Sequence, residues 1–166
     1  ISKGGDAEDL WTEKFNIYKE KYAELTKELV DAISGFLPLN WEDCLPVYRV
    51  TDAPVATRSA SGTVLNALAE KIPTLFGGSA DLAPSNKTFL NNSGIFQKDS
   101  YEGRNIRFGV REHAMTSVMS GMYLHGGVRP FGGTFLVFAD YMRPAIRVAS
   151  LMNLPVIYVL THDSVA

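Results

Sequence analysis

The sequence is short of cysteine, of unbalanced charge and of long apolar runs, and each shortage excludes a class of protein. Its 166 residues contain one cysteine, Cys44, which excludes an internal disulfide framework and a cysteine-rich zinc site. Sixteen basic and 18 acidic side chains give a formal net charge of −2, which lacks the positive field that nucleic-acid binding requires. The longest apolar run, 154–160, contains a proline and is far shorter than the roughly 20 residues of a membrane span. We therefore expect neither a nucleic-acid partner nor a membrane segment.

The two ends of the sequence also lack features. The start has no basic and then apolar pattern of a secretory signal, which together with the lone cysteine predicts a reducing, cytoplasmic compartment. The first residue is Ile1 rather than methionine, and the sequence stops soon after an apolar segment, 155–160, that is typical of a buried strand. Buried parallel strands need covering helices, so we expect this sequence to be a piece of a longer polypeptide.

Two common kinds of site are missing as well. No two of the three histidines have the short spacing that places two zinc ligands on one helical face, so we expect no metal site in this chain. The glycine pairs match neither the dinucleotide fingerprint nor the P-loop. Cys44 lies between acidic neighbours that disfavour a reactive thiolate, and we interpret it as structural.

The first third of the sequence has a helical pattern. Apolar side chains recur at alternating steps of four and three, namely Trp11, Phe15, Tyr18, Tyr22, Leu25 and Leu29. This spacing predicts one long amphipathic helix, with Asp6 and Asp9 near its start and Gly35 and Pro38 at its end. A proline-bearing stretch, 37–54, follows the helix. We interpret residues 1–54 as a linker that docks on a neighbouring surface, and 55–166 as the domain proper.

From Thr57 onward, helical and strand-like patterns alternate. Helices are predicted over 57–72, 111–124 and 138–152, the last with Pro144 as a kink or early-turn residue. Strands are predicted at 74–76 running into Gly77 and Gly78, at 106–110, at 128–135 around a Gly132–Gly133 bend, and at 155–161, while 84–104 is predicted to be a loop. The alternation predicts the α/β class: an open, mostly parallel sheet with helices on both faces.

Ligands of such sheets bind beyond the carboxyl ends of the strands, which selects the segments 77–85, 109–115 and 161–164. The second contains an Arg-Glu-His triplet, 111–113, where a strand turns into a helix. Glu112 there could simply complement the helix dipole. However, Phe135, Phe138 and Tyr141 follow a Gly-Gly-Thr turn at steps of three, so their rings lie near one another. Such a cluster is usually core, but beside a strand-end carboxylate it could form a slot for a heteroaromatic ring.

Four segments, in this order, closely resemble the transketolase family: GGSADLAPSN at 77–86, RFGVREHAM at 107–115, GGTFLVF at 132–138 and THDS at 161–164. The resemblance runs from about Trp11 to the last residue. It covers the linker and much of the pyrimidine-binding domain of that family. The diphosphate-binding domain, with its magnesium motif, and the C-terminal domain are not in this sequence.

The resemblance implies a thiamine diphosphate site. Glu112 matches the family's catalytic glutamate, which bonds to N1′ of the cofactor pyrimidine and favours the imino tautomer that removes the thiazolium C2 proton. Phe135, Phe138 and Tyr141 match the aromatic pocket around the pyrimidine, and Asp81 matches an acidic residue near the thiazolium. Magnesium and the diphosphate would bind outside this chain.

The resemblance also implies a substrate site. Arg58 and Ser85 match a pair that holds the sugar phosphate, and His162 matches a substrate-contacting histidine. Without the resemblance, Arg58 could be an ordinary surface residue, Ser85 could shape a turn and His162 could satisfy backbone groups.

The implied activity is the transfer of a two-carbon ketol unit from a ketose phosphate to an aldose phosphate, as in the pentose phosphate pathway. The implied assembly is a homodimer with the active site at the subunit interface, so the segment alone would be inactive. Two alternatives remain at this stage. One is a deoxyxylulose phosphate synthase-like enzyme, whose pattern Phe138 does not fit. The other is a non-catalytic α/β interaction module, in which the strand-end residues only build the sheet.

Overall fold

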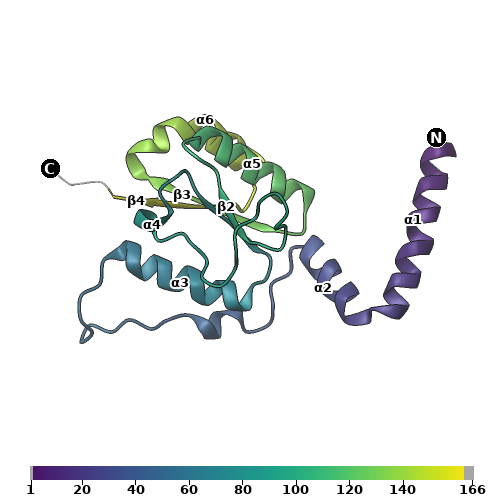
Figure 1. Cartoon of the computed structure of the whole chain (residues 1–166), viewed down its shortest axis with the longest axis horizontal. Coiled ribbons are helices and arrows are strands. Elements are labelled where there is room, and N and C mark those ends of the chain that lie inside the picture. Colours follow the sequence, from purple (N-terminus) through teal and green to yellow (C-terminus); the bar gives the residue numbers. More distant parts are fainter. Residues whose placement is uncertain (1, 163–166) are drawn as a thin grey trace.

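Four parallel strands form the centre of the domain in the computed structural model, which describes residues 2–162 (Figure 1). Their order across the sheet is β2-β1-β3-β4, with bounds β1 (Leu75–Ser79), β2 (Asn105–Arg107), β3 (Arg129–Phe135) and β4 (Ile157–Thr161). Each neighbouring pair is parallel, and Ser79 is in register with Arg107 on one side and Gly133 on the other. The carboxyl ends of the strands therefore meet at one edge, and the predicted open parallel sheet is confirmed.

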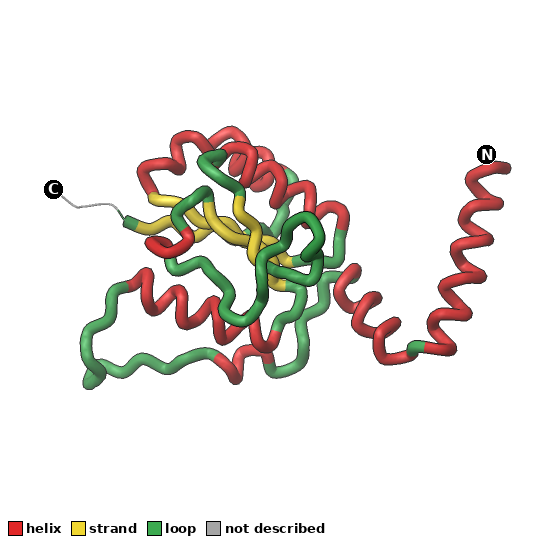
Figure 2. The backbone as a smooth tube through the Cα atoms, viewed as in Figure 1, coloured by secondary structure: helices red, strands yellow, loops and turns green. Residues whose placement is uncertain are grey.

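Helices cover both faces of this sheet, as predicted. Figure 2 shows helical layers above and below the strands. The covering helices are α3 (Thr57–Lys71) on one face, and α5 (Glu112–His125) and α6 (Ala139–Leu151) on the other. One apolar cluster joins α3 to the sheet through Leu65, Ala69, Ile72, Leu75, Leu90 and Phe131. The second cluster joins α5 and α6 to the sheet through Ala80, Met115, Met119 and Met142.

The N-terminal helical segment differs from its prediction, because two helices replace the single one. α1 (Ser2–Lys21) and α2 (Ala23–Ile33) meet at Tyr22, whose φ of −134° and ψ of 61° are not helical. The carbonyl of Tyr22 accepts both the backbone N–H and the hydroxyl of Thr26, each at 2.9 Å, and the Thr26 side chain is buried. The apolar spacing continues across the break, and no proline or glycine marks it, so periodicity could not reveal it.

The ends of this segment agree with the prediction in part. Gly35 ends it with a left-handed φ of 73°, and the N–H of Phe36 bonds back to the carbonyl of Asp31 at 2.9 Å. The start is earlier than expected: α1 begins at Ser2, so Asp6 and Asp9 lie beyond its first turn. A 3-10 turn, η1 (Trp41–Cys44), follows α2 and packs its Trp41 beside the α3 core.

Three element predictions need correction. The strand expected to reach residue 110 ends at Arg107, and the expected loop begins with a short helix, α4 (Ala83–Asn86). No bend interrupts β3 at Gly132 and Gly133, since both pair in register with β4. Instead, a Cβ at Gly132 would lie 2.4 Å from Sδ of the buried Met119, so glycine lets α5 approach the sheet closely.

The remaining helix and strand predictions hold closely. α6 begins after the 3-10 turn η2 (Leu136–Phe138) and contains Pro144 in its interior. In the part of the chain that the structure describes, no helix is long and apolar enough to cross a membrane.

Candidate functional site at the carboxyl edge of the sheet

The carboxyl edge of the sheet gathers the predicted site segments. β1 ends at Ser79 and leads into α4, β3 ends at Phe135, and β4 ends at Thr161. α5 begins at Glu112 on the same edge, because β2 leads into it through a short turn at Gly109. Residues 163 and 164 of the last predicted segment lie outside the described residues.

Glu112 is buried at this edge, with 8% of its surface exposed. The hydroxyl of Thr134, which is fully buried in β3, donates a hydrogen bond to Oε1 of Glu112 at 3.2 Å. A glutamate that merely complemented a helix dipole would extend into water. This one instead turns inward against the end of β3, next to the first residue of the aromatic cluster.

The three predicted aromatic residues do lie together. The rings of Phe135 and Phe138 are nearly parallel, at 10° with centroids 6.0 Å apart, and Tyr141 lies 6.4 Å from Phe138. Phe135 and Phe138 are half-buried, whereas Tyr141 is 67% exposed. His162 also contacts Phe135, with ring centroids 4.5 Å apart. The spacing of three therefore predicted the cluster, but not its contact with the histidine.

A hollow of about 930 Å³ brings two of the predicted substrate residues together. Arg58, in the first turn of α3, and His162, directly after β4, both line it, with Leu136 and the exposed side of β4. Burial raises the pKa of Tyr158, which also lines this hollow, because the phenolate would be poorly solvated there.

Asp81 and Ser85 follow β1 and do not line that hollow. Asp81 is exposed and has a left-handed φ of 62°, and Ser85 is half-buried in α4. The backbone N–H of Ala80 bonds to the carbonyl of Gly133 at 2.9 Å, which ties this turn to the end of β3. The predicted site residues thus share one edge of the sheet, but the structure brings together only some of them in direct contact.

Sequence reasoning missed the buried polar side chains that join these parts. Asn86, fully buried at the end of α4, donates to the hydroxyl of Ser79 at 2.9 Å and accepts from the hydroxyl of Thr161 at 2.5 Å. Thr134, which holds Glu112, is a further member. The sequence did show polar residues at the ends of otherwise apolar strands, and such residues need hydrogen-bond partners when they are buried. It could not show which partners they have.

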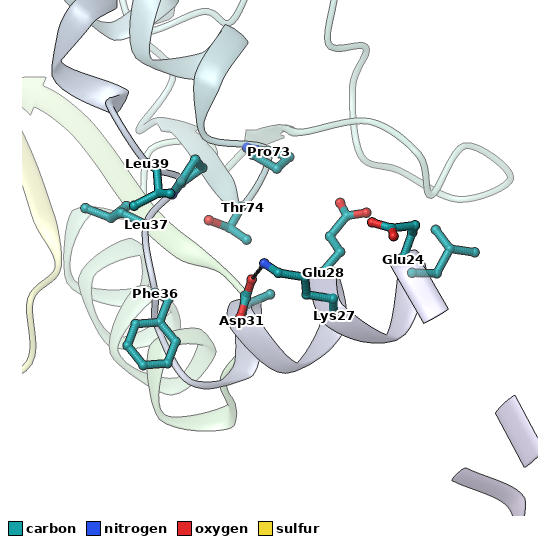
Figure 3. Close-up of a pocket in the computed structure, with 12 residues that line it drawn as sticks. Glu24, Lys27, Glu28, Asp31, Phe36, Leu37, Leu39, Pro73 and Thr74 are labelled. Carbon is teal, nitrogen blue, oxygen red and sulfur yellow. Dashed lines mark hydrogen bonds and ion pairs between the residues drawn. The ribbon is translucent and has the colours of Figure 1, made fainter. Parts of the chain in front are cut away.

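A second pocket, of about 490 Å³, lies at the opposite edge, where α2 passes the residues that precede β1 (Figure 3). Lys27 and Asp31 form a 2.6 Å ion pair in its wall, and this exposed partner raises the pKa of Lys27 through a hydrogen bond and its charge. None of the predicted site residues lines it. Across residues 2–162, no three acidic, histidine or cysteine side chains gather in a group that could hold a metal.

The fold and the carboxyl edge define a class of protein: a parallel α/β domain that presents a buried carboxyl group beside stacked aromatic rings. The chain belongs to the transketolase family, because residues 53–166 match the model described as transketolase, pyrimidine binding domain. This match confirms the resemblance found in the sequence motifs.

Individual relatives agree. The transketolase of Geobacillus stearothermophilus is 58% identical over 163 residues, and that of Bacillus subtilis is 55% identical over 163 residues; each match covers 98% of this chain and 24% of the relative. Among solved structures, the transketolase from Leishmania mexicana superposes with a TM-score of 0.94 and 43% identity, covering 99% of this chain and 24% of that one. The chain thus spans about a quarter of the length of the relatives that it matches.

Proposed function

We propose that this chain is the linker and pyrimidine-binding part of a transketolase, which transfers a two-carbon ketol unit from a ketose phosphate to an aldose phosphate. The observation that carries the proposal is the buried Glu112 carboxyl, bonded to Thr134 next to the Phe135–Phe138 stack. Residues 1–54 would form the linker and 55–166 the domain. The match of the family model to residues 53–166 supports this division.

The residues present suit thiamine diphosphate. A pyrimidine ring needs apolar, aromatic walls and one group that can share a proton with a ring nitrogen. Phe135, Phe138 and Tyr141 supply the walls, and Glu112 supplies the carboxyl group. When bound, thiamine diphosphate would supply an electron sink for cleavage of the ketose carbon–carbon bond.

Within this arrangement Glu112 holds and moves a proton. Thr134 donates to Oε1 and so helps to orient the carboxyl group, whose other oxygen would share a proton with N1′ of a bound pyrimidine. Burial keeps water from competing for that proton. Asp81, on the turn after β1, would lie near the thiazolium.

Arg58, Ser85 and His162 would bind the sugar phosphate. Arg58 and His162 line the same hollow, where a guanidinium group suits a phosphate and an imidazole suits a hydroxyl or phosphate oxygen. The structure of a Pichia stipitis transketolase in complex with sedoheptulose-7-phosphate, which superposes on this chain with a TM-score of 0.92 and 43% identity, supports this substrate class.

We further propose a magnesium ion bound with the diphosphate outside this chain, a cytoplasmic location, and a homodimer whose partner subunit completes the site. The half-buried aromatic cluster supports the dimer, since one side of the stack stays accessible to a second surface. The synthase-like alternative is not favoured, because the relatives named above are transketolases.

A segment exchange tests the proposal. The 166 residues replace the matching segment of the Geobacillus stearothermophilus transketolase, and ketol transfer between sugar phosphates is measured with thiamine diphosphate and magnesium. We expect an active chimera. Glu112→Gln in it should reduce turnover at least about a hundredfold while the fold survives, since a positioned acid–base group contributes that much. Glu102→Gln, a matched change on an exposed loop, should leave turnover unchanged.

Two results would contradict the proposal. A folded but inactive chimera would refute the transketolase function and favour the non-catalytic module. An active chimera in which Glu112→Gln keeps near-normal turnover would refute the role of Glu112.

A further inference from the structure

The helix α2 is attached to the domain with little apolar packing of its own. Neither apolar cluster of the core contains a residue of α1 or α2, and the buried residue of α2, Thr26, bonds within the helical segment itself. Hollows of about 490 and 350 Å³ lie between α2 and the residues before β1. Beyond α2, α1 extends away from the domain (Figure 1). A shared apolar core therefore does not set the direction in which these helices leave the domain.

One hydrogen bond joins the end of α2 directly to the sheet. Nη2 of Arg129 donates to the carbonyl oxygen of Gly35 at 3.0 Å, across 94 positions of the sequence. Arg129 is the first residue of β3, and its backbone N–H bonds to the carbonyl of Thr74 at 2.8 Å. The donor is thus fixed on the sheet, whereas the acceptor belongs to the turn that ends α2. In the part of the chain that the structure describes, no other hydrogen bond joins residues 2–36 to the sheet.

The charge of Arg129 lies where two helices end. Gly126, directly after α5, lies against the last turn of α2, because a Cβ on it would be 3.7 Å from the carbonyl oxygen of Ile33. The ends of α2 and α5 line one hollow of about 270 Å³ together with Arg129. A helix C-terminus carries roughly half a negative charge, so two that meet repel each other unless a cation lies nearby. Arg129 supplies that cation.

No carboxylate competes for this guanidinium group. Within residues 2–162 the ion pairs are Lys27–Asp31 and Asp140–Arg143, and Arg129 belongs to neither. Its Nε is buried and has no hydrogen-bond partner in the same part of the chain. Burying part of a charged group is costly unless its surroundings are negative. The carbonyl of Gly35 and the two helix ends are the groups that supply this negative potential.

We propose that Arg129 is a latch: its guanidinium group holds the end of α2 against the amino edge of the sheet and so fixes the direction in which residues 2–33 leave the domain. In a transketolase these residues would lead to the diphosphate-binding part, so the latch would set where that part lies relative to Glu112. This consequence rests on the proposed function, whereas the latch itself does not.

A distance measurement tests the latch directly. Spin labels are attached to cysteines at Ala23, exposed at the start of α2, and at Ser150, exposed on α6, with Cys44→Ser removing the chain's one cysteine. Residue 23 follows the break at Tyr22, so bending of α1 does not move the label. Double electron–electron resonance should give a narrow distance distribution. Arg129→Met, which keeps the apolar stem but removes every donor, should broaden it.

Two matched variants separate the latch from general damage. Arg129→Lys keeps the charge and a donor and should retain a narrow distribution, and Arg147→Met, at an exposed arginine of α6, should change nothing. Hydrogen exchange of β1 and β3 should be unchanged in Arg129→Met, which verifies the fold, while the amide of Phe36 should exchange faster. Arg129→Gln takes its place if that variant does not fold. A broad distribution in the parent protein would overturn the latch, as would one that stays narrow without the arginine.

Kinetics of the chimera test the consequence for the active site. Arg129→Met should raise the thiamine diphosphate concentration for half-maximal turnover roughly two- to tenfold, as expected for one lost hydrogen bond, with kcat at saturation little changed. An unchanged concentration in an active chimera with broadened distances would overturn the role in assembling the site. An inactive unsubstituted chimera would refute the proposed function, and the distance measurement would still decide the latch.

Discussion

The hydroxyl of Thr134 in β3 donates to Oε1 of Glu112, the first residue of α5, across 3.2 Å. The two residues are 22 positions apart in the sequence, and both are buried. The contact joins the strand that carries the aromatic cluster to the helix that carries the acid. It therefore couples the stability of this edge of the sheet to the orientation of the proposed catalytic group.

Removing this hydroxyl should destabilise the domain. Thr134→Val keeps the shape of the side chain but leaves a buried carboxyl oxygen without its donor, so we expect the free energy of unfolding to fall by about 1–3 kcal/mol. Urea unfolding measures the change. In a Glu112→Ala background the same substitution should have a much smaller effect, because its partner is gone. If Thr134→Val lowered the free energy of unfolding equally in the unsubstituted chain and in Glu112→Ala, the hydrogen bond would contribute little to stability.

Replacing glycine by alanine should have opposite effects on stability at two positions, one in the sheet and one on the exposed side of α5. Gly132→Ala places a Cβ 2.4 Å from Sδ of Met119 and 3.0 Å from Sδ of Met115, both fully buried, so overpacking should lower the free energy of unfolding by about 1–3 kcal/mol. Gly121→Ala, in the interior of α5, meets no atom within 4 Å among the described residues and should raise it by about 0.5–1 kcal/mol. Thermal and urea unfolding compare them. A stabilised Gly132→Ala would show that the methionines move aside freely.

Tyr158 predicts a dependence of stability on alkaline pH. Its hydroxyl is buried without a hydrogen-bond partner among residues 2–162, and desolvation raises its pKa. The folded state thus retains this proton to higher pH than the unfolded state does. Stability from this group is complete below about pH 10, the pKa of an unfolded tyrosine, and is lost as the pH rises towards the folded pKa.

Tyr158→Phe should remove that part of the alkaline loss and raise the free energy of unfolding at neutral pH by up to about 1 kcal/mol, since a buried unpaired hydroxyl is no longer present. Tyr101→Phe, at an exposed side chain, is the matched control. It should change neither the alkaline loss of stability nor the free energy of unfolding at neutral pH. Denaturant unfolding at several pH values between about 7 and 11 gives the comparison. A destabilised Tyr158→Phe would mean that the hydroxyl has a partner in solution.

The chain by itself should bind thiamine diphosphate negligibly. It supplies the proposed pyrimidine walls and carboxyl group, but within residues 2–162 no three acidic, histidine or cysteine side chains gather in a group that could hold a metal. Titration calorimetry with thiamine diphosphate and magnesium should show no saturable heat for the 166-residue chain and clear binding for the chimera. Tight, magnesium-dependent binding by the chain alone would contradict this expectation.

Local pattern was enough for most of the architecture. Alternating helical and strand-like segments predicted the open parallel sheet and its two helical layers, because the side chains that face the core repeat with the period of each element. The same reasoning placed Phe135, Phe138 and Tyr141 together, since residues three apart on one turn are neighbours whatever the rest of the chain does.

Pattern failed where a single backbone angle or a distant partner decided the outcome. The break at Tyr22 changes one pair of dihedral angles without disturbing the apolar spacing. Asn86 and Thr161 are 75 residues apart, and only the parallel register of β1, β3 and β4 brings them within hydrogen-bond distance. The amino-acid sequence alone therefore determined most of the elements and, through its motifs, the main chemical groups of the candidate site. Which group each side chain bonds to was decided by tertiary structure, because a hydrogen bond requires both partners at one place and orientation.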